Sequence, residues 1–309
     1  MPRPLVPSRL APGGVHAHAS RRAPRTVVGA YVALTKPRII ELLLITTVPT
    51  MVLAQGGWPS WELVGVTLLG GALAAGGANA INMYVDRDID ALMERTSGRP
   101  LVTGIIEPRN ALVFAIALQI AAFAVLWAGA NLLSAVLAFS AAAFYVGVYT
   151  LWLKRTSRQN IVIGGAAGAV PVLVGWAAVT DGLAWEALIL FVAMFLWTPP
   201  HFWALAVKYA DDYDAADVPM LPVVAPMREV INQMLAYTVG LVAATLVLWP
   251  VADLGFIYGI TAIVLGAMFL VGTVLLGRSP TPAASMRLFG FSITYVTVLF
   301  GAMTLDVLV

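Results

Sequence analysis

The chain has 309 residues, of which 60% are hydrophobic and only 11% are charged, and its mean hydropathy is +0.88. Soluble globular domains carry about a quarter charged residues, so this composition excludes a soluble domain. The absence of cysteine excludes a disulfide, a thiolate nucleophile and a cysteine-ligated metal. The net charge of +2 is small, and we expect no nucleic-acid partner.

Residues 1–30 form an arm that contains five arginines, several prolines and alanines, and no acidic residue. An arginine-rich, acid-poor composition is typical of a mitochondrial transit peptide. The prolines disfavour an amphipathic helix, which favours instead a disordered basic arm lying against anionic lipid headgroups. Residues 31–309 are expected to form a single transmembrane domain.

Apolar stretches of about 20 residues recur along this domain, and each is long enough to cross roughly 30 Å of hydrocarbon. We expect an all-α polytopic membrane protein, because lipid leaves the backbone polar groups no partner outside their own helix. The sequence predicts nine transmembrane helices, near residues 33–54, 62–84, 109–129, 131–152, 160–180, 185–207, 230–251, 254–276 and 286–306.

The connections between these spans alternate in charge. Four short connections, around 56–60, 129–131, 180–182 and 251–253, carry no lysine or arginine, and all 18 basic residues can be placed on the other side. The positive-inside rule then predicts a cytoplasmic N-terminus, and nine spans put the C-terminus outside. The expected location is the cytoplasmic membrane of a bacterial cell, with the mitochondrial inner membrane as the alternative.

A first acidic cluster lies where the second span ends. Asn82, Asp86 and Asp90 are spaced by four residues, which stacks them on one helical face, and Asn79 extends that stripe. These hard oxygen ligands suit Mg²⁺, which usually binds one or two carboxylates together with substrate phosphates. A solvated loop whose charged side chains pair with each other is the alternative.

Basic side chains lie near this cluster. Arg95 and Arg99 follow it at a spacing of four, and guanidinium groups bind phosphate in a bidentate manner, so the segment offers both halves of a diphosphate site. Another polar group on the same side of the membrane contains Lys154, Arg155, Arg158, Gln159 and Asn160. For that group, phosphate binding and lipid headgroup binding are both open.

A second acidic cluster, residues 208–217, follows the sixth span on the same side of the membrane. Lys208 and Asp212 share a helical face, and His201 precedes Lys208 by seven residues on that face. Two clusters that converge on one cavity would hold Mg²⁺ and a diphosphate between them. An ordinary charged loop is the alternative.

His201 follows two prolines inside the sixth span. Pro199 and Pro200 are expected to kink or break the helix and to free carbonyl groups toward a cavity. A histidine within a membrane span is a candidate for function. A hydrogen-bonded structural histidine is the other interpretation, and the residues alone leave both open.

Several segments resemble a known superfamily. Residues 82–101, with Asn82, Asp86 and Asp90, resemble the first signature of the intramembrane aromatic prenyltransferases. Residues 197–206 and 218–223 resemble, more specifically, the protohaem IX farnesyltransferases of that superfamily, and residues 35–38 are also similar to them. The resemblance covers about residues 30 to 306.

The second cluster departs from the pattern of the superfamily. Many members carry a second pair of aspartates spaced by four, whereas Ala216 lies four residues after Asp212. Haem farnesyltransferases often have glycine where this chain has Asp217. Asp211, Asp214 or Asp217 are therefore candidates to replace the missing carboxylate.

The resemblance implies that farnesyl diphosphate donates its farnesyl group to a vinyl group of haem B, which gives haem O. It implies four catalytic residues, Asp86, Asp90, Asp212 and His201, and a Mg²⁺ site formed by Asn82, Asp86, Asp90 and Asp212. His201 would ligate the haem iron or orient a propionate. The substrate-binding residues would be Asn79, Asn82, Arg95, Arg99, Lys154, Lys208 and Arg38. The expected partners also include the lipid bilayer and other haem-pathway or terminal oxidase assembly proteins.

Two other functions remain open from the sequence. A related prenyltransferase for a quinone precursor or another aromatic acceptor would share the diphosphate site. A cation-coupled transporter would also contain carboxylates and broken helices, although its carboxylates are expected near the bilayer midplane rather than at one boundary.

Overall fold

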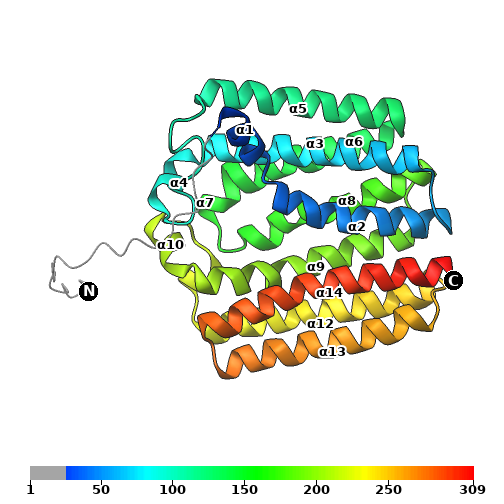
Figure 1. Cartoon of the computed structure of the whole chain (residues 1–309). Helices are drawn as coiled ribbons and strands as arrows, with labels where there is room; N and C mark the ends of the chain where they lie inside the picture. The colour runs from blue at the N-terminus through cyan, green and yellow to red at the C-terminus, as the bar shows by residue number, and fades with distance from the viewer. Residues whose placement is uncertain (1–25) are drawn as a thin grey trace.

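A computed structural model describes residues 26–309, apart from the side chains of residues 39 and 42–44. Residues 1–25 of the expected arm lie outside this described part, and the first helix, α1, begins at Val27. All regular elements of the described part are helices, and the long ones lie side by side in one bundle (Figure 1).

Eight helical segments of residues 26–309 are long and apolar enough to cross a membrane, so the protein is a multi-pass membrane protein. Seven are single helices: α3 (Trp61–Val85), α5 (Pro108–Gly129), α8 (Asn160–Thr180), α9 (Trp185–Lys208), α12 (Met227–Val251), α13 (Phe256–Arg278) and α14 (Pro282–Leu308). The eighth is a compound span, Leu132–Thr156. A ninth helix of the bundle is α2 (Pro37–Gln55), and Ile45–Gln55 is the apolar part of it whose side chains are all described.

The first expected span, near 33–54, is not one continuous helix. The chain breaks at Lys36, between α1 (Val27–Thr35) and α2, where Lys36 has a left-handed backbone with φ 54° and ψ 62°. The cause is Pro37, because a proline disfavours the right-handed helical conformation of the residue before it. The break turns the Lys36 side chain away from a regular helical position.

The compound span contains a π-helix. It begins as α6 (Leu132–Phe144), continues as the π-helix η1 (Tyr145–Leu153) and ends with the short α7 (Lys154–Thr156). The wider turns of a π-helix change the direction in which the following side chains point, and such segments occur frequently at functional sites. The residues that η1 repositions include Thr150 and Lys154.

The two prolines of the sixth span do not break it. The helix α9 continues from Trp185 to Lys208 with Pro199 and Pro200 buried inside it, so the helix is not broken there, and the kink that was the other expectation stays a prediction. Neighbouring helices can hold a proline-containing transmembrane helix together, and α9 packs against α8, α12 and α14.

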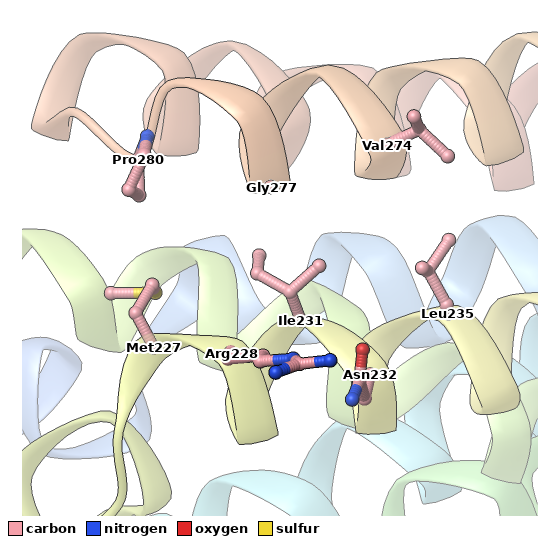
Figure 2. A pocket seen from close by; sticks show the side chains of 8 residues that line it. All are labelled: Met227, Arg228, Ile231, Asn232, Leu235, Val274, Gly277 and Pro280. Carbon is pink, nitrogen blue, oxygen red and sulfur yellow. The ribbon is translucent and has the colours of Figure 1, made fainter.

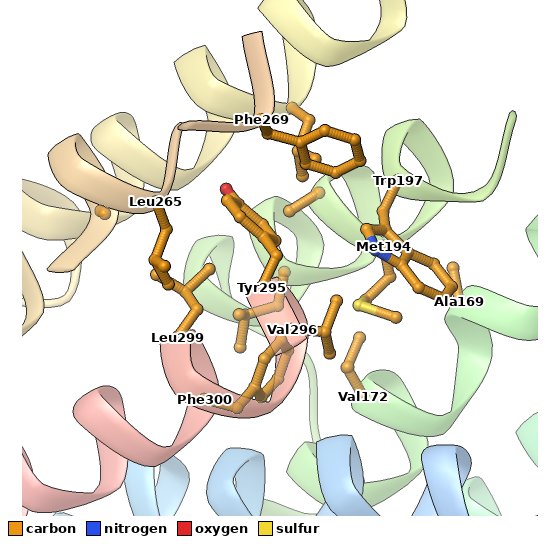
Figure 3. Close-up of a cluster of buried hydrophobic side chains, with 14 of the residues drawn as sticks. Ala169, Val172, Met194, Trp197, Leu265, Phe269, Tyr295, Val296, Leu299 and Phe300 are labelled. Carbon is orange, nitrogen blue, oxygen red and sulfur yellow. The ribbon is translucent and has the colours of Figure 1, made fainter. Parts of the chain in front are cut away.

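The largest apolar core lies among α8, α9, α12, α13 and α14, where aromatic rings dominate the packing (Figure 3). The rings of Phe269 and Tyr295 meet edge to face at 5.4 Å, and Tyr258 donates a hydrogen bond to the Thr245 carbonyl at 2.9 Å. Among the described residues, this core contains no charged side chain, and the charged residues of these helices lie toward the helix ends. The short helices α4 (Arg87–Leu92), α7 and α10 (Ala210–Ala215) gather at one end, opposite the C-terminus (Figure 1).

Candidate active site

The first acidic cluster is a buried polar stripe at this end of the bundle. Asp86 joins α3 to α4, and the backbone hydrogen bonds from Asp86 to Asn82 (2.9 Å) and from Asp90 to Asp86 (2.8 Å) maintain the helical path. Asn82, Asp86 and Asp90 therefore lie one above another, as their spacing predicts. Their exposed fractions are only 3%, 0% and 1%.

Asn82 connects three helical segments. Its Nδ2 donates to Asp86 Oδ2 at 2.6 Å and lies 3.2 Å from Thr150 Oγ1 in η1. Its Oδ1 accepts from Lys36 Nζ at 2.8 Å. The amide therefore orients the Asp86 carboxylate and holds the ammonium group of Lys36 next to it.

Each buried carboxylate has a hydrogen-bonded basic partner on one oxygen only. Lys154 pairs with Asp86 Oδ2, and Arg99 Nη1 lies 2.5 Å from Asp90 Oδ2. Arg155 Nη2 approaches Asp86 Oδ1 at 3.7 Å, which is ion-pair distance but not a hydrogen bond. Asp86 Oδ1 and Asp90 Oδ1 are buried without a hydrogen-bond partner among the described residues. Buried acceptors of this kind are costly unless a ligand satisfies them.

These two free carboxylate oxygens fit Mg²⁺. They are hard ligands, and Mg²⁺ usually takes one or two carboxylates with water and substrate phosphates as its remaining ligands. Within residues 26–309, no three His, Asp or Glu side chains gather into a metal-binding group. The chain could therefore hold the ion through Asp86 and Asp90, with Asn82 in support, once a diphosphate supplies further oxygens.

Asp212 of the second cluster lies against the loop that follows α4. Its two carboxylate oxygens accept hydrogen bonds from the backbone N–H groups of Glu94 and Arg95, both at 3.3 Å. Asp211, Asp214 and Asp217 are exposed. The structure thus brings the two clusters together through Asp212, which holds the first loop in place.

Arg95 lies between the clusters. Its guanidinium carbon is 5.5 Å from the ring centroid of Tyr209 and 5.7 Å from that of Tyr213, and its buried Nε has no hydrogen-bond partner among the described residues. Lys208 is exposed, with Nζ 5.3 Å from the Tyr209 ring. The Arg95 guanidinium has no carboxylate partner among the described residues, so it can donate hydrogen bonds to a phosphate oxygen.

The polar segment 154–160 divides between two regions. Lys154 and Arg155 face the first cluster, whereas Arg158 Nη1 lies 3.1 Å from Glu229 at the start of α12. Asn160 is completely buried, and neither Oδ1 nor Nδ2 has a hydrogen-bond partner in the described part of the chain. This amide is a further polar group that a substrate could satisfy.

Asp88 lies on the outer side of α4. Both of its oxygens accept from Arg155 at 2.7 Å, and this hydrogen bonding lowers the pKa of the Asp88 carboxyl from 3.8 to about 2. The side chain is 60% exposed, so solvent screens the pair. Its role is to position Arg155 beside Asp86.

Two predicted substrate-binding residues have other surroundings. Asn79 is buried and its Nδ2 donates to the Thr35 carbonyl at 3.0 Å, which ties α3 to the end of α1. Arg38 is exposed in the first turn of α2. It is the neighbouring Lys36, not named among the expected site residues, that contacts Asn82.

Sequence reasoning also omitted Thr150 and gave Arg155 no specific role. Lys36 could have been found from the Lys-Pro pair, because a helix usually ends at or before the residue that precedes a proline. The apolar pattern of η1 contains no comparable signal for Thr150, whose position depends on the π-helix.

His201 is about two turns of α9 away from the second cluster, toward the core. It is 6% exposed, its Nδ1 lies 2.6 Å from Ser292 Oγ in α14, and its ring stacks between Trp197 and Phe289. In the structure, no described contact joins it to Lys208 or Asp212.

One open pocket of the described residues lies away from this site. It has a volume of about 320 Å³ and lies between α12 and α13, where Met227, Ile231, Leu235 and Val274 form apolar walls and Arg228 lies at one side (Figure 2). None of the predicted site residues lines it.

Comparisons with known proteins identify the family of the chain. Residues 43–297 match the UbiA prenyltransferase family. The protoheme IX farnesyltransferase of Parafrankia sp. (strain EAN1pec) is 52% identical over 297 residues, which covers 95% of this chain and 93% of that protein. Protoheme IX farnesyltransferase 1 of Saccharopolyspora erythraea is 53% identical over 296 residues, covering 94% and 93%.

Solved structures share the fold. A digeranylgeranylglyceryl phosphate synthase matches with a TM-score of 0.76 at 16% identity, over 91% of this chain and 98% of that one. A UbiA homologue from Archaeoglobus fulgidus, bound to DMAPP and Mg²⁺, matches with a TM-score of 0.60 at 18% identity, over 89% and 99%. The chain therefore belongs to the UbiA prenyltransferase family, among the protoheme IX farnesyltransferases.

Proposed function

We propose that the enzyme transfers the farnesyl group of farnesyl diphosphate to a vinyl group of haem B and so forms haem O. The observation that carries this proposal is the pair of buried carboxylates, Asp86 and Asp90, each with one free oxygen and each beside a basic side chain. The names of the relatives support haem as the acceptor.

The polar end of the bundle suits departure of a diphosphate. A bound Mg²⁺ would supply Lewis-acid neutralisation of the leaving group. Lys36, Lys154, Arg99 and Arg95 would stabilise the remaining negative charge, because all four lie at or beside the buried stripe. Asp212 would hold the loop that carries Arg95 in position.

The bond changes follow from this arrangement. The C–O bond between the farnesyl group and the diphosphate breaks, and its electron pair leaves with the diphosphate. The vinyl group of haem B supplies the electron pair for the new carbon–carbon bond. The resulting cation then takes the oxygen of a water molecule, which loses a proton and leaves a hydroxyethylfarnesyl substituent.

The membrane arrangement completes the proposal. Nine spans with α1 and α2 as the first, a cytoplasmic N-terminus and an external C-terminus would place the diphosphate site at the cytoplasmic face of a bacterial membrane. The apolar helices would shield the farnesyl chain from water. The relatives are bacterial proteins, which favours this location over the mitochondrial inner membrane.

A product assay with competing acceptors tests the function. Purified enzyme given farnesyl diphosphate, Mg²⁺, haem B and 4-hydroxybenzoate should convert haem B to haem O, detected by mass and by chromatography. Prenylation of 4-hydroxybenzoate with haem B left unchanged would replace the haem assignment with a quinone-precursor function. Membership of a prenyltransferase family already removes the transporter alternative.

A further inference from the structure

His201 is held in a stack of aromatic rings, and a third ring, that of Phe202, meets it at 88° with the centroids 5.1 Å apart. The ring centroids of Trp197 and Phe289 lie 4.1 and 4.5 Å from that of His201, at interplanar angles of 21° and 28°. Both faces of the imidazole are therefore covered. A ligand can reach this side chain only through a ring nitrogen.

Ser292 determines which nitrogen is available. His201 Nδ1 lies 2.6 Å from Ser292 Oγ, and the same Oγ donates to the Phe289 carbonyl at 2.6 Å. A hydroxyl has one hydrogen, so Ser292 Oγ accepts from His201 and Nδ1 carries the hydrogen. The Ser292 carbonyl also accepts from Trp197 Nε1 at 2.9 Å, so one residue orients both rings.

The surroundings of His201 favour the neutral ring. The ion pairs of the described residues involve other side chains, and no Asp or Glu among them lies within ion-pair distance of His201. An unpaired buried charge is costly. In the neutral ring with hydrogen on Nδ1, Nε2 carries the lone pair, and no described residue donates a hydrogen bond to it.

We propose that Ser292 fixes this tautomer and thereby presents His201 Nε2 as a ligand for the iron of the haem acceptor. This rests on the proposed function. A propionate would need a hydrogen from the ring, but the one ring hydrogen is already donated to Ser292. Iron needs the lone pair, and histidines that bind metals commonly have the other nitrogen held by a hydrogen-bond acceptor. Ser292 is thus a positioning residue.

His201 lies inside the bundle, away from the end of α9. It precedes Lys208, the last residue of α9, by seven residues, which corresponds to about 10 Å along the helix axis. The carboxylates and their basic partners lie at the end of the bundle where α9 ends. The proposed iron ligand therefore lies on the helix that ends at the proposed diphosphate site.

Nitrogen NMR tests the tautomer without haem. The chain has three histidines, so a His16→Gln/His18→Gln background leaves His201 alone. In this background, ¹⁵N-histidine spectra of the full chain should show Nδ1 protonated and Nε2 unprotonated. Ser292→Ala should redistribute the tautomers, and Ser292→Thr, which keeps the hydroxyl, should retain the original one. A protonated Nε2 in the parent, or an unchanged spectrum in Ser292→Ala, overturns the role of Ser292.

Haem titration tests the ligation. Ser292→Ala should weaken haem B binding about 10–100-fold, the usual effect of losing an outer-shell partner, while farnesyl diphosphate binding is unchanged. His201→Ala should lose the histidine-ligated haem absorption band, and Ser292→Thr should keep it. Thermal unfolding identifies variants that simply misfold.

The outcomes separate the two proposals. If haem binds the parent chain and His201→Ala with the same spectrum, iron ligation is overturned while the haem acceptor stands. If the parent chain binds no haem B, the proposed acceptor is overturned and iron ligation with it, and the NMR result alone then decides the role of Ser292.

Discussion

The acidic cluster at the end of α3 and the acidic cluster after α9 lie at the same end of the bundle, yet their carboxylates have opposite surroundings. Asp86 and Asp90 are fully buried, and each has a basic partner and a free oxygen. In the second cluster, three of four aspartates are exposed, and Asp212 binds backbone N–H groups. Whether a carboxylate is available to a metal therefore depends more on the helix face on which it lies than on the number of carboxylates in the segment.

The largest effect is expected from Asp86→Asn. This change removes a candidate metal ligand and leaves the buried Lys154 without its counter-charge, so turnover should fall on the order of 10³-fold. Farnesyl transfer per folded enzyme is the measurement. Breaking a buried pair also costs about 3 kcal/mol or more of stability, so unfolding must be followed in parallel.

Two matched variants separate the causes. Asp86→Asn/Lys154→Met removes both charges and should regain stability but not activity. Asp214→Asn changes an exposed aspartate of the second cluster and should leave turnover as it was. A wild-type rate in Asp86→Asn would remove this residue from the metal site.

A smaller effect is expected from Asp212→Asn. Its carboxylate accepts two backbone hydrogen bonds, and a hydrogen bond to a charged group contributes about 1.5–3 kcal/mol, so losing one of them corresponds to about a tenfold change. The KM for farnesyl diphosphate should rise, because the loop carrying Arg95 loosens. Asp90→Asn, tested beside it, should impair turnover more. Equal losses in both would make the two clusters functionally equivalent.

Lys36→Met should raise the KM for farnesyl diphosphate by about tenfold, since it removes a charged hydrogen bond to Asn82 next to the substrate phosphates. Arg38→Gln is the comparison, because Arg38 is exposed and lies only two residues after Lys36. Steady-state kinetics at saturating acceptor would measure both. A larger effect of Arg38→Gln would restore the expectation drawn from the sequence.

The smallest effect is expected for Asp88. Because its pKa in the folded chain is lowered to about 2, the Asp88–Arg155 pair stabilises the fold above the ordinary pKa of 3.8 and is lost as the pH falls through about 2. The pair is exposed, so Asp88→Asn should cost less than about 1 kcal/mol at neutral pH. Unfolding followed from pH 5 downward should show the variant and the parent converging. If the two proteins still differed in stability near pH 2, Asp88 would contribute to stability by something other than its ion pair with Arg155.

Most of the fold could be predicted because long apolar runs determine it. The expected span 62–84 corresponds to α3 (Trp61–Val85), and the expected span 160–180 corresponds to α8 (Asn160–Thr180). Failures occurred at prolines, where backbone chemistry and hydropathy conflict. Pro37 interrupts the first expected span, whereas Pro199 and Pro200 leave α9 continuous.

The site was predictable only within single helices. The four-residue spacing placed Asn82, Asp86 and Asp90 on one face because neighbouring turns of one helix determine it. The contacts from Lys36 and Thr150 cross between helices, and one of these helices has π geometry. A one-dimensional pattern contains neither piece of information, nor does it show that Ser292 lies beside His201.

At Lys36 the left-handed backbone favours glycine, whereas the contact with Asn82 requires the lysine side chain. A side chain in this conformation costs about 1–2 kcal/mol, which glycine would avoid. Glycine there would, however, remove the ammonium group from Asn82. A thermostability screen that ignored activity would favour replacing this lysine, and stabilising the enzyme is better attempted at positions away from the α1–α2 junction.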